Sequence, residues 1–132
     1  MRLALTLTAL AFAAPALAQN IDCKDAITQM EMNICAGKDY QAADKRLNKV
    51  YGKLLAAADD KDKELLRKAE RAWITFRDTQ CEYQASGSSG GSIHPMELAG
   101  CYEALTDART KQLEQLIDCP EDTLNCKKLR KD

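Results

Sequence analysis

The sequence predicts an all-α fold, a small disulfide-stapled bundle of about four helices with a long central antiparallel hairpin. Large apolar residues recur at steps of three or four around Trp73, which is helical spacing. A Gly/Ser break over residues 87–92 separates this segment from a second helical one. Six cysteines follow an N-terminus typical of exported proteins, and an even count there favours three disulfides.

Residues 1–18 have the pattern of a cleaved signal peptide. Arg2 precedes the apolar run of residues 3–14, and Ala16-Leu17-Ala18 provides a small-residue cleavage site. The mature chain then divides into a helical domain, residues 19–118, and a polar tail, residues 119–132. We expect a periplasmic or secreted protein without stable membrane insertion, because no apolar run is long enough to span a bilayer.

Composition and motifs give little support to catalysis. Lys and Arg number 19 against 20 Asp and Glu, a balance that does not favour nucleic acid as a partner. His94 is the single histidine and there is no C-x-x-C, so no metal or other cofactor is expected. The serines lack a G-x-S-x-G context and the cysteines should be oxidised, which leaves no activated nucleophile. The sequence therefore predicts a binding protein, not an enzyme.

Helix boundaries follow from caps and breakers. We expect a first helix over residues 24–36, ended by Gly37, with Ala26, Ile27, Met30 and Ile34 on its inward face. A second helix should run from Asp39 to about residue 54, before a charged turn over residues 59–62.

The third and fourth helices form the expected hairpin. The third should span residues 62–85, with an inward stripe of Leu66, Ala69, Trp73 and Phe76. The fourth should span residues 95–117, because Pro95 suits a first helical turn. Its expected inward face is Leu98, Cys101, Leu105, Ala108, Gln112 and Leu116.

The cysteine spacing limits the disulfide pairing. Cys119 and Cys126 are close enough for a local bridge in the tail. Cys23 and Cys35 would lie about 18 Å apart at the two ends of the first helix, whereas bridged Cα atoms lie within about 7 Å. Two pairings remain open, 23–81 with 35–101 and 23–101 with 35–81.

Two candidate polar features accompany the hairpin. Arg77 and Asp78, beside Trp73 and Phe76, are interpreted as a structural ion pair. Thr106 and Arg109 of the fourth helix either complete a network with that pair or face water. These positions are predicted to be structural.

The long connection over residues 86–96 is the candidate site for a partner. It contains Ser89, Gly90, Gly91, Ser92 and His94, between helices that disulfides would hold. Functional residues often lie on loops carried by a rigid scaffold, and glycines let a partner approach the backbone closely. The alternative is a flexible connection without a binding role.

Many spaced positions resemble the LprI-type lysozyme-inhibitor N-terminal domain family. They are Asp22-Cys23, Thr28-Gln29-Met30-Glu31-Met32-Asn33, Cys35-Ala36, Tyr40, Ala43-Asp44, Leu47-Asn48, Tyr51, Arg71-Ala72-Trp73, Phe76-Arg77-Asp78, Cys81, Gly90-Gly91-Ser92, Met96, Cys101, Leu105-Thr106 and Arg109. The resemblance implies a helical, exported protein that inhibits a lysozyme. The tail with Cys119 and Cys126 lies outside the shared pattern.

The leading functional hypothesis is therefore a lysozyme inhibitor whose loop over residues 86–96 enters the enzyme cleft. A binding or immunity-type protein for another cell-wall hydrolase or envelope partner is the alternative. A purely structural envelope protein with an inert loop is the third interpretation.

Overall fold

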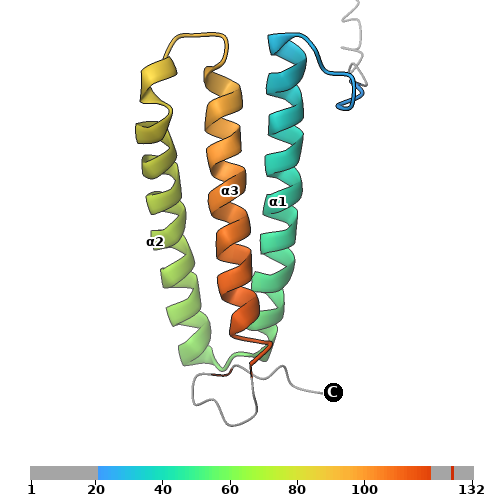
Figure 1. Cartoon of the computed structure of the whole chain (residues 1–132). Helices are drawn as coiled ribbons and strands as arrows, with labels where there is room; N and C mark the ends of the chain where they lie inside the picture. The colour runs from blue at the N-terminus through green and yellow to red at the C-terminus, as the bar shows by residue number, and fades with distance from the viewer. Residues whose placement is uncertain (1–20, 120–125, 127–132) are drawn as a thin grey trace, which may run out of the picture.

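The computed structural model describes residues 21–119 and residue 126, and they form three long helices. These are α1 (Gln29–Ala57), α2 (Asp60–Gln84) and α3 (His94–Gln115), with a short 3-10 turn, η1 (Ser86–Ser88), after α2. Figure 1 shows α1 and α3 running in one direction and α2 in the other. The all-helical fold is confirmed, with three long helices in place of about four and no strand within the described part.

The expected first and second helices are one helix. α1 begins where Thr28 caps it: the Thr28 hydroxyl accepts from the Glu31 amide, and the Glu31 carboxylate accepts from the Thr28 amide. Hydrogen bonds to the Glu31 carboxylate from the Thr28 amide, the Thr28 side chain and the Ile27 amide hold the pKa of Glu31 below its usual value. The predicted break at Gly37 is wrong, because one glycine costs a helix only about 1 kcal/mol.

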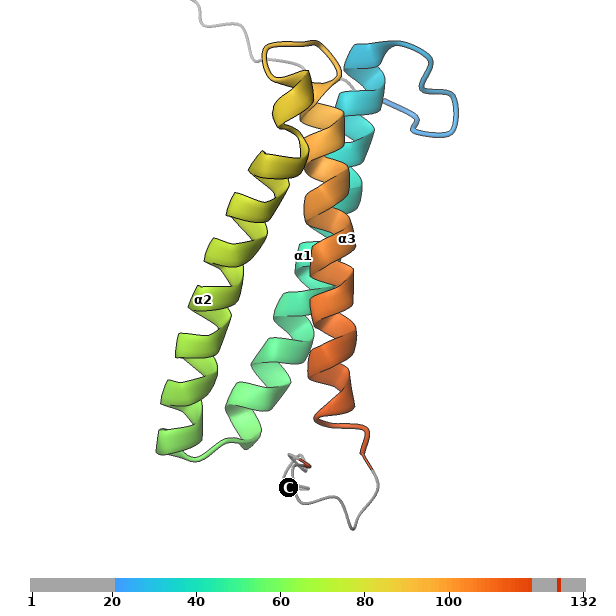
Figure 2. The ribbon, with the colours of Figure 1, turned by 60° about the vertical axis from the view of Figure 1, so that its left-hand side comes forward.

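α1 and α3 form the main packing pair. Leu47, Val50 and Leu54 of α1 pack with Leu113 of α3, and Trp73 of α2 packs against this cluster. α2 and α3 are antiparallel neighbours, as the expected hairpin requires, but α3 packs chiefly on α1. Figure 2 shows α2 diverging from α3 toward the turn that joins α2 to α1.

Each of the three helices has residues whose predicted inward direction is wrong. Ile27 and Met30 are 86% and 63% exposed, because Ile27 precedes α1 and Met30 lies on the side of α1 opposite the buried residues Cys35 and Ala43. Phe76 is 55% exposed, whereas Arg77 beside it is buried. On α3 the buried residues are Ala99, Thr106, Thr110 and Leu113, while Ala108 and Gln112 are exposed.

The disulfides pair locally: Cys23–Cys35, Cys81–Cys101 and Cys119–Cys126. Both pairings left open for the first four cysteines are therefore wrong. The helix begins after Thr28, so Cys23 lies in a preceding segment that returns to α1, and its Cα is 5.6 Å from that of Cys35. The 18 Å separation predicted from a rise of 1.5 Å per residue does not apply outside a helix.

The predicted signal peptide lies outside the described residues, as does the tail apart from Cys119 and Cys126. Among the described helices, none combines the length and apolarity needed to cross a membrane.

Candidate functional site

A compact loop joins α2 to α3 at one end of the bundle, and we call residues 86–93 the tip loop (Figure 1). Its two ends meet at the Ala85 carbonyl. The Ser88 hydroxyl donates to this oxygen at 2.9 Å, and His94 Nδ1 lies 3.1 Å from it. A carbonyl only accepts, so Nδ1 carries the proton and donates. His94 therefore ties the start of α3 to the end of α2.

Further hydrogen bonds give the tip loop a defined path. The Gly91 amide donates to the Ser88 carbonyl at 2.9 Å. Gly90 has φ of 78°, a conformation that favours glycine. From α1, Asn33 Nδ2 donates to the Ser92 carbonyl at 2.9 Å. All three helices thus contribute to the conformation of this loop.

The tip loop exposes most of the predicted partner-binding residues together. Ser89, Gly90, Gly91 and Ser92 are all exposed at its apex. His94 is different, because it is half-buried and occupies the first position of α3. Ser88 was missed by the sequence analysis. Its hydrogen bond to His94 depends on the turn at residues 86–88, which no sequence spacing had indicated.

The contact between Ser88 and His94 does not form a nucleophile–base pair. The two atoms lie 3.2 Å apart, but Ser88 already donates to the Ala85 carbonyl, and Nδ1 carries the proton. A general base needs an unprotonated nitrogen facing the hydroxyl, held by a third group. The geometry fits a structural connection between the two ends of the loop.

A buried arginine lies between the helices, away from the loop. Arg77 of α2 binds the Asp78 carboxylate through Nε and Nη2 at 2.8 and 2.7 Å. Its guanidinium lies over the rings of Tyr40, Trp73 and Tyr102, 5.2–5.5 Å from their centroids. Burial raises the pKa of both tyrosines. This aromatic cage joins α2 to α1 and α3.

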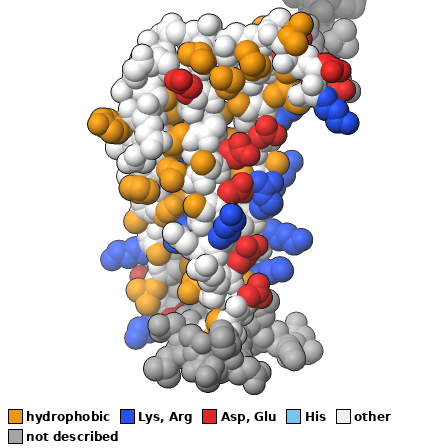
Figure 3. Space-filling model, viewed as in Figure 1, with side chains coloured by type: hydrophobic (Ala, Val, Ile, Leu, Met, Phe, Trp, Pro, Cys, Tyr) orange, Lys and Arg blue, Asp and Glu red, His pale blue; other side chains and the backbone are white. Residues whose placement is uncertain are grey.

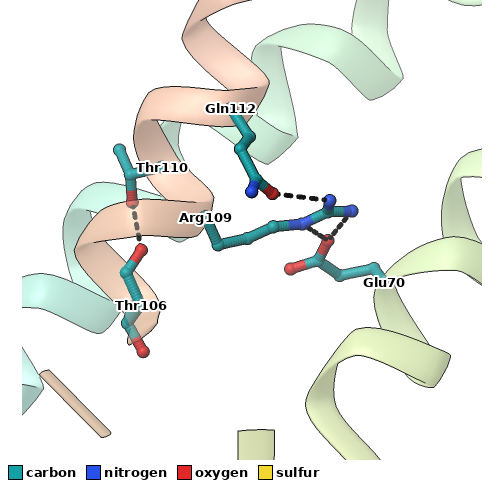
Figure 4. A network of polar contacts seen from close by, with 5 residues as sticks. All are labelled: Glu70, Thr106, Arg109, Thr110 and Gln112. Carbon is teal, nitrogen blue, oxygen red and sulfur yellow. Dashed lines mark hydrogen bonds and ion pairs between the residues drawn. The ribbon is translucent and has the colours of Figure 1, made fainter. Parts of the chain in front are cut away.

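Arg109 takes a separate partner (Figure 4). It reaches from α3 to the Glu70 carboxylate of α2, with nitrogen–oxygen distances of 3.0 and 3.2 Å, and lies 5.8 Å from the Trp73 ring centroid. Glu70 is buried and was missed by the sequence analysis. Its position in the stripe with Leu66 and Trp73 could have indicated an inward side chain.

Thr106 does not join either network through its hydroxyl. The residue is fully buried, and its Oγ1 has no hydrogen-bond partner in the described structure. Its backbone carbonyl instead accepts from the Thr110 hydroxyl at 2.9 Å (Figure 4). Within residues 21–119 and 126, no group of three or more potential metal ligands comes together.

Comparison with known proteins identifies the family of this chain. The family model described as "Lysozyme inhibitor LprI" matches residues 22–113, which include the capped start of α1, the aromatic cage and the tip loop. The chain belongs to the LprI lysozyme inhibitor family. The match stops at Leu113, so the tail after α3 lies outside the family model.

Two curated relatives are similar to this LprI family member. One is the "Uncharacterized protein R02472" of Rhizobium meliloti (strain 1021), 45% identical over 123 residues, which cover 82% of this chain and 88% of the relative. The other is the "Uncharacterized protein YecT" of Escherichia coli (strain K12), 28% identical over 113 residues and 70% of each chain. No solved structure matches significantly.

Proposed function

We propose that this LprI family member is an exported lysozyme inhibitor that places its tip loop in the enzyme's cleft. The family assignment supports the kind of partner. The observation that supports the site is the hydrogen-bonded tip loop, which presents Ser89 through Ser92 at the end of a narrow bundle. The signal-peptide pattern and three disulfides suit an oxidising compartment outside the cytoplasm.

Preorganisation favours binding through this loop. Ordering a flexible loop on association costs roughly 0.5–1.5 kcal/mol for each immobilised side chain. Here the Ala85 carbonyl, Ser88, His94 and Asn33 already define the path of the loop. The loop is therefore already ordered by folding, and binding loses little further conformational entropy.

The chemistry of the loop suits a cleft that binds sugars. No charged residue occurs between Glu82 and Glu97. The exposed groups at the apex are serine hydroxyls and glycine backbone, which can take the place of sugar hydroxyls. A lysozyme cleft contains two catalytic carboxyl groups, and the hydroxyl and amide donors of the loop can hydrogen-bond to them without bringing a charge of the inhibitor into the cleft.

The proposal is tested by titrating a lysozyme with oxidised mature protein, residues 19–132, using c-type and g-type enzymes. We expect stoichiometric inhibition of at least one class. The double variant Ser89→Ala with Ser92→Ala should weaken inhibition roughly tenfold, equivalent to about 1.4 kcal/mol. Ser86→Ala is the matched control, because this exposed hydroxyl lies at the start of the loop.

Unchanged lysozyme activity at a large excess of folded protein would contradict the proposal. Capture of a different cell-wall hydrolase would then favour the immunity-type alternative. Equal inhibition by the wild type, the double variant and the control would keep lysozyme as the partner and exclude the serine hydroxyls from the contact.

A further inference from the structure

α2 carries a second apolar face that the bundle leaves uncovered. Leu65 and Phe76 are each 55% exposed, and Tyr83 is 76% exposed. They belong to a stripe with alternating steps of four and three residues, which we call the outer stripe: Leu65, Ala69, Ala72, Phe76, Thr79 and Tyr83. All six are exposed, and no charged residue interrupts the stripe.

The outer stripe is distinct from the buried side of the same helix. The buried side consists of Glu70, Arg77 and Cys81, with Trp73 packed against the core. At 3.6 residues per turn, Phe76 points about 100° away from Arg77 around the helix axis. In Figure 3 hydrophobic side chains spread over the α2 side of the molecule, whereas most visible acidic side chains lie nearer α1.

Alternating steps of four and three are the spacing of a two-helix coiled-coil seam. A continuous exposed apolar surface of this kind marks an interaction site more often than ordinary surface. A hollow on this face, lined by Ala72, Phe76, Thr79 and Tyr83 among others, supplies space for a side chain from outside.

The outer stripe is complementary to itself when two copies of α2 meet antiparallel. In one register all six positions are paired: Leu65 faces Tyr83 of the second copy, Ala69 faces Thr79, and Ala72 faces Phe76. The large Phe76 ring of one copy thus faces the small Ala72 side chain of the other, as interdigitated packing requires. A two-fold axis repeats each contact, which is the usual geometry of a homodimer.

Charges beside the outer stripe complement each other in the same register. Lys68 and Glu82 flank it on one side, and both are exposed. Neither forms an ion pair within the described part of the chain. Across the two-fold axis, Lys68 of one copy meets Glu82 of the other, twice per dimer. Flanking charges of this kind determine partner and orientation in helix pairs.

We propose that the outer stripe of α2 is a homodimer interface, in which a second copy of this chain packs antiparallel through Phe76 and Ala72. This inference is independent of the proposed lysozyme site. In this register the first residue of α2 in the second copy lies level with Ser88, so the apex residues 89–92 extend past the α2 helix of the second copy.

The test is sedimentation velocity of the oxidised mature protein over about 1–500 µM. We expect a concentration-dependent dimer whose dissociation constant rises at least tenfold in Phe76→Arg. Ile74→Arg is the matched control, because Ile74 is also an exposed apolar residue of α2, 40% exposed, but lies off the stripe. Far-UV circular dichroism confirms that each variant is folded.

A charge exchange tests the register. Lys68→Glu alone and Glu82→Lys alone should each weaken the dimer about threefold to tenfold by placing like charges opposite each other. The double variant should restore wild-type dimerisation, because a glutamate at position 68 of one copy then faces a lysine at position 82 of the other. Failure of the double variant to restore it would overturn the antiparallel register.

A monomer at all concentrations, or a dimer equally stable in Phe76→Arg, would overturn the interface. If the wild type is monomeric and Phe76→Arg abolishes lysozyme inhibition, the outer stripe contacts the enzyme and not a second copy. Loss of dimerisation with unchanged lysozyme inhibition is the result that this inference predicts.

Discussion

Arg77 shows how one buried cation can hold a weakly packed helix in place. α2 makes few contacts with the rest of the bundle, and Arg77 concentrates three ring contacts and an ion pair at one position. A guanidinium can stack on rings while binding a carboxylate through two nitrogens, which an ammonium cannot do. The aromatic cage therefore requires arginine, and not only a positive charge.

Arg77→Lys is expected to lower the free energy of unfolding by about 1–3 kcal/mol, through lost stacking and the loss of one of the two nitrogen contacts to Asp78 Oδ1. Arg46→Lys is the matched control. Arg46 also binds an aspartate, Asp107, at 2.8 Å, but its side chain is 52% exposed, so the change should cost under about 1 kcal/mol. Urea denaturation followed by circular dichroism measures both. Equal losses in the two variants would contradict the role of the cage.

Glu31 gives the stability of α1 an acid-side pH dependence. Its folded pKa lies below the usual value because three hydrogen bonds, chiefly from Thr28, favour the carboxylate. The stabilisation is therefore present above the unfolded pKa and is lost as the pH falls through the folded pKa. Glu31→Gln should remove this part of the dependence, so the two denaturation midpoints should converge at low pH. Parallel pH profiles for the two proteins would exclude the carboxylate as the cause.

Residue-level prediction from the sequence selected the helical segment around Trp73 but was wrong about the direction of Phe76. The apolar pattern placed Phe76 inward, whereas Phe76 is exposed and Arg77 is buried. Hydrophobicity alone cannot predict that three rings from three helices surround an arginine. Tyr40 and Tyr102 become its neighbours only through tertiary packing.

At the scale of elements, the start of α1 decides the disulfide pairing. The sequence Thr28-Gln29-Met30-Glu31 has the S/T-x-x-E form of a capping box, which predicts a helix start at this point. The predicted start at residue 24 is wrong, and that start excluded the Cys23–Cys35 bridge that the structure contains. The correct boundary was thus readable from local sequence, whereas the divergence of α2 was not.

The Cys81–Cys101 bridge closes a segment of the chain that includes the whole tip loop. Replacing both cysteines by alanine should lower the free energy of unfolding by about 3 kcal/mol, from loop-closure entropy alone. Inhibition of lysozyme should weaken as well, because the disulfide no longer crosslinks α2 and α3 beside the loop. Urea denaturation and the lysozyme assay measure the two effects.

Replacing Cys23 and Cys35 by alanine is the matched control, because this bridge also joins residues of one short segment, with a sequence separation of 12 against 20 for Cys81–Cys101, and lies outside the tip loop. It should lower stability by a comparable amount, about 3 kcal/mol, with inhibition unchanged wherever the variant is folded. Loss of inhibition in the control alone would place the binding surface at the start of α1.

At the scale of the whole molecule, the bundle separates two surfaces along its length. The tip loop lies at one end, and the outer stripe runs along the side of α2. The sequence predicted the exposed apex residues as the candidate site, and that assignment stays a prediction. It missed the outer stripe, because one helix carried two apolar faces and only the structure shows which of them is buried.

The most direct measurement compares lysozyme inhibition by the wild type, Gly91→Ala and Gly87→Ala. A Cβ at Gly91 would lie 3.0 Å from the Ser88 carbonyl oxygen, which accepts a hydrogen bond from the Gly91 amide. A Cβ at Gly87 would meet no atom within 4 Å. The two variants therefore add the same methyl group to the same region of the chain, and only one of them disturbs the turn.

If the preorganised tip loop blocks the enzyme, Gly91→Ala should raise the inhibition constant roughly tenfold, through strain of about 1–3 kcal/mol. Gly87→Ala should leave that constant within about twofold of the wild type, since ordinary surface substitutions have effects within about 0.5 kcal/mol. Equal inhibition by all three proteins, or no inhibition by the wild type, would contradict the account.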